Sequence, residues 1–155
     1  MSQESMQEHA IERTIVEASP SLCAAVVADV ASYPEWAKAI EAAEVLAADD
    51  AGRPELVSFV AAGFGRRTSY TLRYDWSNAP AEVSWALEEG DVLATLDGSY
   101  RFEPEGGASD RTEVIYELSV GLAMPIPGFV RRRAETKILQ LALPELKARV
   151  EAVPI

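Results

Sequence analysis

The residues of this chain that could do chemistry are aromatic rings, and they recur at the spacing of β-strands. Tyr70 and Tyr74 occupy alternating positions of one segment, and Trp85, Tyr100 and Tyr116 occupy later segments of the same kind. Alternate residues of a strand share one face of a sheet. Rings on one face could line a pocket for a flat or chain-like ligand, and a tyrosine could donate a hydrogen bond to a ligand carbonyl or act as a general acid. The alternative for any one ring is that it only fills the core.

A second aromatic group flanks Pro34. Tyr33 and Trp36 could form the mouth of such a pocket, because amphipathic rings suit a site that is half wet. Phe59 is a further candidate for the pocket lining. Proline disfavours the helical conformation of the residue before it, so Tyr33 is expected to be extended. The alternative is that Tyr33 and Trp36 pack short helices onto the sheet.

Two arginines follow a predicted bend that contains the small residues Ala61, Ala62, Gly63 and Gly65. Arg66 or Arg67 could bind a ligand carboxylate or a phosphopantetheine arm, because guanidinium binds oxyanions through two parallel hydrogen bonds. The other interpretation is that both arginines lie at the solvated end of a hairpin.

Three consecutive arginines, Arg131, Arg132 and Arg133, stand at the start of the last predicted helix. Three consecutive helical residues span about 200° around the axis, so at least one of them must leave the solvent-facing side. In an acidic protein this cluster could dock an acyl-carrier protein or the anionic head of a ligand. The alternative is pairing with nearby carboxylates such as Glu135.

Composition excludes several other kinds of site. The chain has 155 residues with one histidine, His9, and one cysteine, Cys23. A Ser-His-Asp triad, a multi-histidine metal centre, a cysteine-rich zinc site and an internal disulfide are therefore not expected, and no metal or other cofactor is predicted. The net charge of −11 argues against general binding to nucleic acid and against docking on anionic lipid headgroups.

Targeting signals are not apparent. No apolar run reaches the roughly 18 residues that a membrane span needs. The N-terminus lacks the basic start and apolar core of a secretory signal, so a cytoplasmic protein is expected. We predict that residues 1–9 form a flexible N-terminal tail and that residues 10–155 form a single domain. One domain is usual for a chain of this length.

The elements that must position the candidate residues are mostly strands. Turn residues such as Gly52 and Gly90 separate segments in which apolar and polar residues alternate, which predicts an antiparallel meander. Ser19 and Pro20 predict the start of a short buried helix, because serine caps a free backbone N–H and proline at the first helical position loses no hydrogen bond. The predicted strands are residues 10–18, 40–48, 54–62, 66–77, 81–88, 92–104 and 111–122.

A long helix is predicted over residues 129–152. Its apolar residues recur at near-helical spacing, and Val130, Ala134 and Ile138 are expected to face the sheet and line the pocket. About 24 residues at 1.5 Å each give a helix of about 36 Å, which is long enough to cross a whole domain. The order of strand, two short helices, six strands and long helix predicts an α+β fold.

Three stretches of the chain resemble those of a known superfamily. The first is Ser19-Pro20 with Asp29-Val30-Ala31-Ser32-Tyr33-Pro34-Glu35-Trp36, the second runs from Gly98 to Pro104 and from Arg111 to Leu118, and the third is Pro125-Ile126-Pro127-Gly128-Phe129. On these stretches the chain resembles the START-like helix-grip superfamily, and within it the bacterial polyketide cyclase/dehydrase and coenzyme-Q-binding-like branch. The resemblance spans about residues 11–152.

The resemblance implies a helix-grip fold, in which a curved seven-stranded antiparallel sheet wraps around a long C-terminal helix. Two short helices follow the first strand, and an elongated apolar pocket lies between sheet and helix. Members bind lipids, quinones, sterols or polyketides, so we expect a carrier or sensor of a hydrophobic small molecule. One alternative is a polyketide cyclase, aromatase or dehydratase that acts on a carrier-bound substrate by positioning and hydrogen bonding. The other is a protein that acts through a protein partner.

Overall fold

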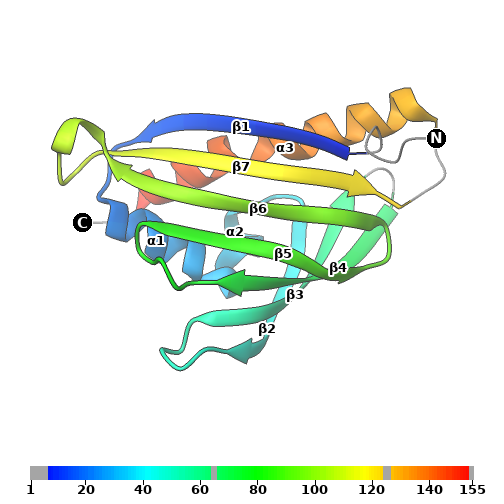
Figure 1. Cartoon of the computed structure of the whole chain (residues 1–155), viewed down its shortest axis with the longest axis horizontal. Coiled ribbons are helices and arrows are strands. Elements are labelled where there is room, and N and C mark those ends of the chain that lie inside the picture. Colours follow the sequence, from blue (N-terminus) through cyan, green and yellow to red (C-terminus); the bar gives the residue numbers. More distant parts are fainter. Residues whose placement is uncertain (1–6, 64–65, 124–126, 154–155) are drawn as a thin grey trace.

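The fold consists of one antiparallel sheet and a long helix, with short helices between the first two strands (Figure 1). The computed structural model describes residues 7–63, 66–123 and 127–153. This order of elements confirms the predicted α+β class. The strands are β1 (Gln7–Val16), β2 (Ile40–Ala48), β3 (Pro54–Gly63), β4 (Arg66–Asp75), β5 (Glu82–Gly90), β6 (Leu93–Pro104) and β7 (Thr112–Leu122). The helices are α1 (Pro20–Ala28), α2 (Tyr33–Trp36) and α3 (Gly128–Ala152), with 3-10 turns η2 (Val30–Ser32) and η3 (Glu105–Gly107).

The seven strands form one sheet in the order β1-β7-β6-β5-β4-β3-β2. All neighbouring strands are antiparallel, as expected for a meander joined by short turns. The exception to the sequential order is β1, which pairs with β7, so the first and last strands lie side by side. The predicted seven-stranded helix-grip sheet is therefore confirmed.

The prediction of a flexible tail over residues 1–9 is wrong for its last three residues. β1 begins at Gln7, which pairs with Gly121, so residues 7–9 belong to the sheet. The Nε2 atom of His9 also lies 2.8 Å from a carboxylate oxygen of Glu117. A polar segment suits an edge strand as well as a tail, because one face of an antiparallel sheet can be wet. The other residues of the predicted tail, 1–6, lie outside the described residues.

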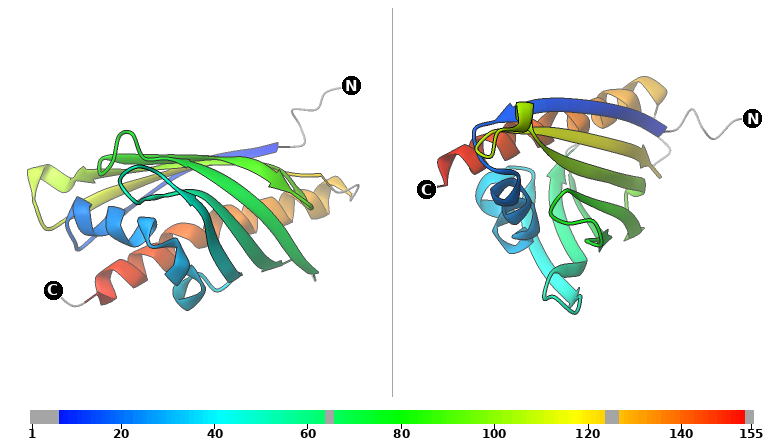
Figure 2. Two further views of the ribbon diagram at one scale, coloured as in Figure 1. Left: turned by 90° about the horizontal axis from the view of Figure 1, so that it is seen from below. Right: turned by 60° about the vertical axis from the view of Figure 1, so that its left-hand side comes forward.

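Helix α1 begins where Ser19 and Pro20 predict it. The Ser19 hydroxyl accepts a hydrogen bond from the Leu22 amide at 3.1 Å, and Pro20 is the first helical residue. The helix contacts α3 and β6, so it closes one end of the space between the sheet and α3 (Figure 2).

The backbone of Tyr33 contradicts the prediction of an extended residue. Its φ of −53° and ψ of −40° are helical, and it is the first residue of α2. Tertiary contacts outweigh the preference that Pro34 imposes. The Tyr33 hydroxyl donates to the Val27 carbonyl, and its ring packs against Trp36 and Phe59.

Helix α3 lies on the concave side of the sheet, which curves around it (Figure 2). It packs mainly against β1 and β7, and its C-terminal half also meets α1 and α2. Polar contacts tie this half in place. Arg149 Nη2 lies 3.0 Å from Glu35 on α2, and Glu151 accepts a hydrogen bond from the Glu17 amide at 2.9 Å.

The alternation read from the strands is confirmed in the core. Leu72 and Tyr74 of β4 and Trp76 directly after it are buried, whereas Arg73 and Asp75 between them are exposed. On β7 the buried alternate residues are Val114, Tyr116, Leu118, Val120 and Leu122. The concave face of the sheet is therefore apolar and aromatic.

Candidate functional site

All five tyrosines of the chain belong to or pack against the core on the concave side of the sheet. Tyr74, Tyr100 and Tyr116 are buried, with at most 8% of their surface exposed. Tyr33 and Tyr70 are half-buried and pack against the same core. The five residues come from α2, β4, β6 and β7, so the curvature of the sheet gathers rings that are scattered along the sequence.

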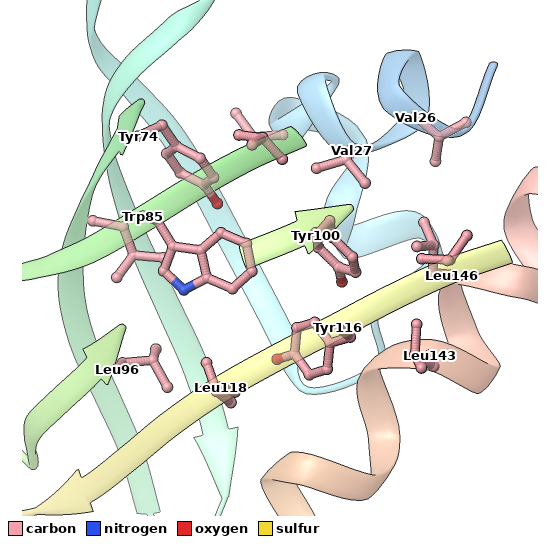
Figure 3. Packing of buried hydrophobic residues seen from close by; sticks show 14 of the residues in the cluster. Val26, Val27, Tyr74, Trp85, Leu96, Tyr100, Tyr116, Leu118, Leu143 and Leu146 are labelled. Carbon is pink, nitrogen blue, oxygen red and sulfur yellow. The ribbon is translucent and has the colours of Figure 1, made fainter. Parts of the chain in front are cut away.

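Trp85 lies at the centre of the deeper rings (Figure 3). Its ring centroid is 5.4 Å from that of Tyr100, 6.0 Å from that of Tyr74 and 6.1 Å from that of Tyr116. Tyr100 and Tyr116 are directly paired on β6 and β7, and their centroids are 4.9 Å apart. These are the spacings of favourable aromatic contacts. We call Tyr74, Trp85, Tyr100 and Tyr116 the inner cluster.

A second row of rings leads from α2 to β4. Trp36 meets Tyr33 edge to face at 5.1 Å, Tyr33 stacks on Phe59 at 6.0 Å, and Phe59 stacks on Tyr70 at 5.4 Å. We call these four rings the outer row. Tyr33 joins it to the inner cluster, because Tyr33 packs against the core that contains Tyr74 and the two hydroxyls influence each other's pKa. All the aromatic residues predicted for the pocket are thus in one connected group.

Several polar atoms of these aromatic residues have no hydrogen-bond partner among the described residues. Among the described residues, no group hydrogen-bonds the hydroxyls of Tyr70, Tyr100 or Tyr116. The indole Nε1 of Trp36 is shielded from water and is also without a partner in the described part of the chain. A buried donor left unpaired costs about 1–3 kcal/mol. Native proteins keep few such groups, and their presence is typical of a site that another molecule completes.

Burial raises the pKa of every tyrosine in the chain. Desolvation of the charged phenolate is the largest cause in each case. The hydroxyls therefore keep their protons at ordinary pH, where they can donate hydrogen bonds but cannot act as phenolate bases. The tyrosines with this raised pKa are Tyr33, Tyr70, Tyr74, Tyr100 and Tyr116.

Gly98 lets Trp85 reach the inner cluster. The two residues are paired across β5 and β6, and a Cβ at position 98 would lie 2.9 Å from Cζ2 of Trp85. A glycine inside a strand often marks either a bulge or a close approach, and at Gly98 the structure shows the close approach.

Helix α3 closes the inner cluster with aliphatic side chains. The prediction named Ala134, which is buried, and Ile138, which is half-buried and packs on the core. It missed Leu143 and Leu146, which Figure 3 shows across from the inner cluster and which are 4% and 0% exposed. The signal was present, since the same helical period continues to these residues.

Val130 does not belong to the site as predicted. Its side chain is 42% exposed, and the first turns of α3 reach beyond the end of β1 (Figure 1). Helical periodicity identifies the apolar side of a helix, but not how far along the helix the sheet extends.

The arginines after the small-residue bend are not shown to reach the site. Arg67 is exposed, and its Nε lies 2.6 Å from a carboxylate oxygen of Glu41. This contact fits the alternative interpretation of a solvated hairpin end. The side chain of Arg66 lies outside the described part of the structure.

Two arginines of the triple cluster are available on the surface. Arg132 and Arg133 are exposed, and neither forms an ion pair with any described residue. The side chains of Arg131 and Glu135 lie outside the described part of the structure, so the predicted pairing with Glu135 stays a prediction.

A surface hollow that the sequence did not indicate lies beside the β2–β3 turn and strands β4 and β5. It has a volume of about 750 Å³, and its lining includes the buried Tyr74 and Trp85 of the inner cluster as well as exposed charged residues. Its charged walls pair with each other, since Arg73 lies 3.0 Å from Glu88 and Arg53 lies 3.1 Å from Asp49. The hollow therefore has a charged rim and an aromatic part, and it differs from the predicted pocket because none of the described residues of α3 lines it.

Other kinds of site find no support in the described residues. Within them, no group of three His, Cys, Asp or Glu side chains is placed to hold a metal ion. None of the described helices is long and apolar enough to cross a membrane. The Cys23 thiol is buried, and burial raises its pKa, so it is not a reactive thiolate at ordinary pH.

Comparison with known proteins gives one family match. A family described as polyketide cyclase/dehydrase and lipid transport matches residues 16–147, which is most of the chain. No match was found among curated proteins.

Three solved structures show the same fold at low sequence identity. A START superfamily protein from Mycobacterium smegmatis is 22% identical with a TM-score of 0.82, and the match covers 92% of this chain and 97% of that one. A protein from Thermus thermophilus is 24% identical with a TM-score of 0.78, over 94% and 98% of the two chains. The Zhui aromatase/cyclase from a Streptomyces species is 17% identical with a TM-score of 0.78, over 94% of each chain. These similarities establish the fold alone.

Proposed function

The chain belongs to the polyketide cyclase/dehydrase and lipid transport family, and we propose that it binds a hydrophobic small molecule as a carrier or sensor. The ligand would lie between the sheet and α3, against the inner cluster and the outer row. Ala134 and Ile138 would contact it from the helix. Lipids, quinones and polyketide-like molecules are the candidate ligands.

One observation carries this proposal, namely tyrosine hydroxyls without described protein partners in an apolar interior. Tyr70, Tyr100 and Tyr116 each place such a hydroxyl there. A residue needed only for packing could be phenylalanine, because a hydroxyl without a partner adds nothing to packing. Ligand pockets combine apolar walls with a few placed polar groups, and these three hydroxyls supply that combination.

The test is native mass spectrometry of the protein purified from its own organism, followed by solvent extraction. A stoichiometric apolar molecule would support the proposal and identify the ligand class. A protein that is empty as purified and takes up no apolar fluorescent dye would contradict it.

A matched pair of variants shows where the ligand binds. Ala134→Phe adds a ring to the buried side of α3 and should abolish ligand or dye uptake. Ala148→Phe adds the same ring at an exposed position of the same helix and should leave uptake unchanged. Equal uptake by the two variants would place the ligand elsewhere.

A second candidate function is cyclisation or dehydration of a polyketide attached to an acyl-carrier protein. The observation that favours it is the surface at the start of α3, where Arg132 and Arg133 adjoin exposed Phe129 and Val130. An acidic carrier with an apolar cargo would complement this surface. Each other arginine with a described side chain pairs with a carboxylate: Arg13, Arg53, Arg67, Arg73, Arg101, Arg111 and Arg149.

This second function requires both docking and turnover. The double variant Arg132→Glu with Arg133→Glu should weaken binding of an acyl-carrier protein at least tenfold. The control, Arg13→Glu with Arg101→Glu, reverses the same amount of charge on the sheet and should leave binding within about twofold. Failure to convert any carrier-bound poly-β-ketone would contradict the enzyme function and leave the binding function intact.

A further inference from the structure

The partnerless polar groups of the interior can all donate hydrogen bonds. The indole N–H of Trp36 can only donate, because an indole has no acceptor atom. The hydroxyls of Tyr70, Tyr100 and Tyr116 keep their protons, since burial raises their pKa. A molecule that completes this interior must therefore bring at least one acceptor atom for Trp36, whereas the tyrosine hydroxyls can either donate or accept.

The indole N–H of Trp36 is the hydrogen-bond donor that most clearly lacks an acceptor. Its Nε1 is shielded from water and has no partner among the described residues, whereas the indole N–H of Trp76 donates to the Pro54 carbonyl at 2.6 Å. Trp36 stands at the end of the outer row, on a helix of four residues that has no side-chain cap bond.

The described interior offers nothing that would neutralise an anion. Its buried polar residues are Thr68 and Thr112, which are uncharged. The charge that acts on the inner cluster is the carboxylate of Glu145, which helps to raise the pKa of Tyr100. Two cations of α3, Lys147 and Arg149, are close to Glu145 in the sequence. Both of them pair with carboxylates. A carboxylate or phosphate placed inside would be desolvated without a compensating cation, which costs several kcal/mol.

We propose that the ligand is an uncharged molecule with ketone or quinone oxygens, and that the Trp36 indole N–H donates a hydrogen bond to one of them. This inference rests on the proposed function and narrows its list of ligands. A quinone or a polyketide ketone fits the interior. An ionised fatty acid or a phospholipid does not, because its charged end has no partner there.

Three probes of nearly equal size test the ligand class. They are 2-acetylnaphthalene, a ketone; 2-ethylnaphthalene, its hydrocarbon counterpart; and 2-naphthoate, a carboxylate. The ketone should bind about tenfold more tightly than the hydrocarbon, which is the effect of one hydrogen bond made in a dry site. The carboxylate should bind at least tenfold more weakly than the ketone. Isothermal titration calorimetry measures all three affinities.

Two variants test the role of Trp36. Trp36→Phe keeps an aromatic ring and removes the N–H, so it should lower ketone affinity about tenfold and leave the hydrocarbon within about twofold. Trp76→Phe removes an indole N–H that is already bonded to Pro54. It should leave the ratio of ketone to hydrocarbon affinity unchanged, even if it lowers the melting temperature.

Nuclear magnetic resonance gives a direct readout of the hydrogen bond. The chain has three tryptophans, so a ¹⁵N-labelled sample gives three indole signals that single variants assign. The Trp36 indole proton should move downfield when the ketone is added and should not do so with the hydrocarbon. The Trp76 signal should stay in place with both probes.

The outcomes separate this inference from the function on which it rests. Equal affinity for ketone and hydrocarbon, tightest binding of the carboxylate, or a ketone preference that survives in Trp36→Phe would each overturn the inference and leave the binding function standing. If none of the three probes binds, the proposed function itself fails.

Discussion

The indole ring of Trp85 packs directly against the backbone of Gly98, the residue with which Trp85 is paired on the neighbouring strand. A Cβ at position 98 would lie 2.9 Å from Trp85 Cζ2 and 2.9 Å from Leu118 Cδ1, and closer still to the carbonyl oxygen of Glu117. The glycine therefore sets the depth to which Trp85 enters the inner cluster.

Gly98→Ala should destabilise the protein and disturb the site together. The added methyl group meets backbone as well as side chains, so it cannot be accommodated by a rotamer change alone. Overpacking of this kind costs about 1–3 kcal/mol. Urea unfolding should show that loss, and the near-ultraviolet circular dichroism of the aromatic rings should change.

Gly52→Ala is the control for Gly98→Ala. Gly52 has a φ of +83° and open space around it, so alanine there meets backbone strain without a clash. The cost should be about 1–2 kcal/mol, with an unchanged aromatic spectrum. If both variants give the wild-type spectrum, Gly98 does not position Trp85.

Alkaline pH should unfold the protein through its tyrosines. Each tyrosine has its pKa raised by burial in the folded state, so its stabilising effect is complete below the unfolded pKa of about 10 and is lost as pH rises above it. Five such groups lower the free energy of unfolding by up to about 7 kcal/mol per pH unit. Phenolate absorbance should therefore rise in the same pH interval in which circular dichroism reports unfolding.

The variant Tyr100→Phe tests the origin of that dependence. It removes one of the five tyrosines, so stability above pH of about 10 should fall less steeply, by about one proton's contribution. A phenolate signal with a midpoint near 10 in a chain that is still folded would contradict the burial of these hydroxyls.

Most of the fold could be predicted from two local patterns. They are the alternation of apolar and polar residues in strands and the residue types that begin a helix. The residues on β4 and β7 alternate because one face of the sheet is buried, and that period can be read without a structure. Ser19 and Pro20 predicted the start of α1 for an equally local reason, a cap bond and a missing N–H.

The candidate site could be predicted only in part. The predictions that failed depend on contacts between residues that are far apart in the sequence. Tyr33 is helical since contacts with Val27 and Phe59 hold it there, and neither contact can be read from the residues around Pro34. Val130 has the right helical phase, but its side chain is 42% exposed near the start of α3. That the Trp36 indole N–H has no partner among the described residues can be seen only from the folded structure.

Thr112→Val should cost about 1–3 kcal/mol although it preserves shape. Thr112 is fully buried, and its hydroxyl donates to the Ala18 carbonyl at 2.7 Å, which ties the start of β7 to the chain entering α1. Valine leaves that carbonyl unpaired. Thr71→Val, at a half-exposed position of β4, is the matched control and should stay within about 0.5 kcal/mol of wild type. Equal melting temperatures for the two variants would show that the Thr112 bond contributes nothing.

Ser19→Ala should weaken the helix that closes one end of the site. The Ser19 hydroxyl accepts the Leu22 amide at 3.1 Å, and its loss leaves that N–H at the start of α1 without a side-chain acceptor. The expected cost is about 1 kcal/mol in thermal or urea unfolding. Ser32→Ala is the control, because the Ser32 hydroxyl donates to the exposed Asp29 carboxylate and does not cap α2, so it should cost less than half as much. Faster amide exchange confined to the first turn of α1 would attribute the loss to the cap, whereas uniform exchange across the sheet would argue against it.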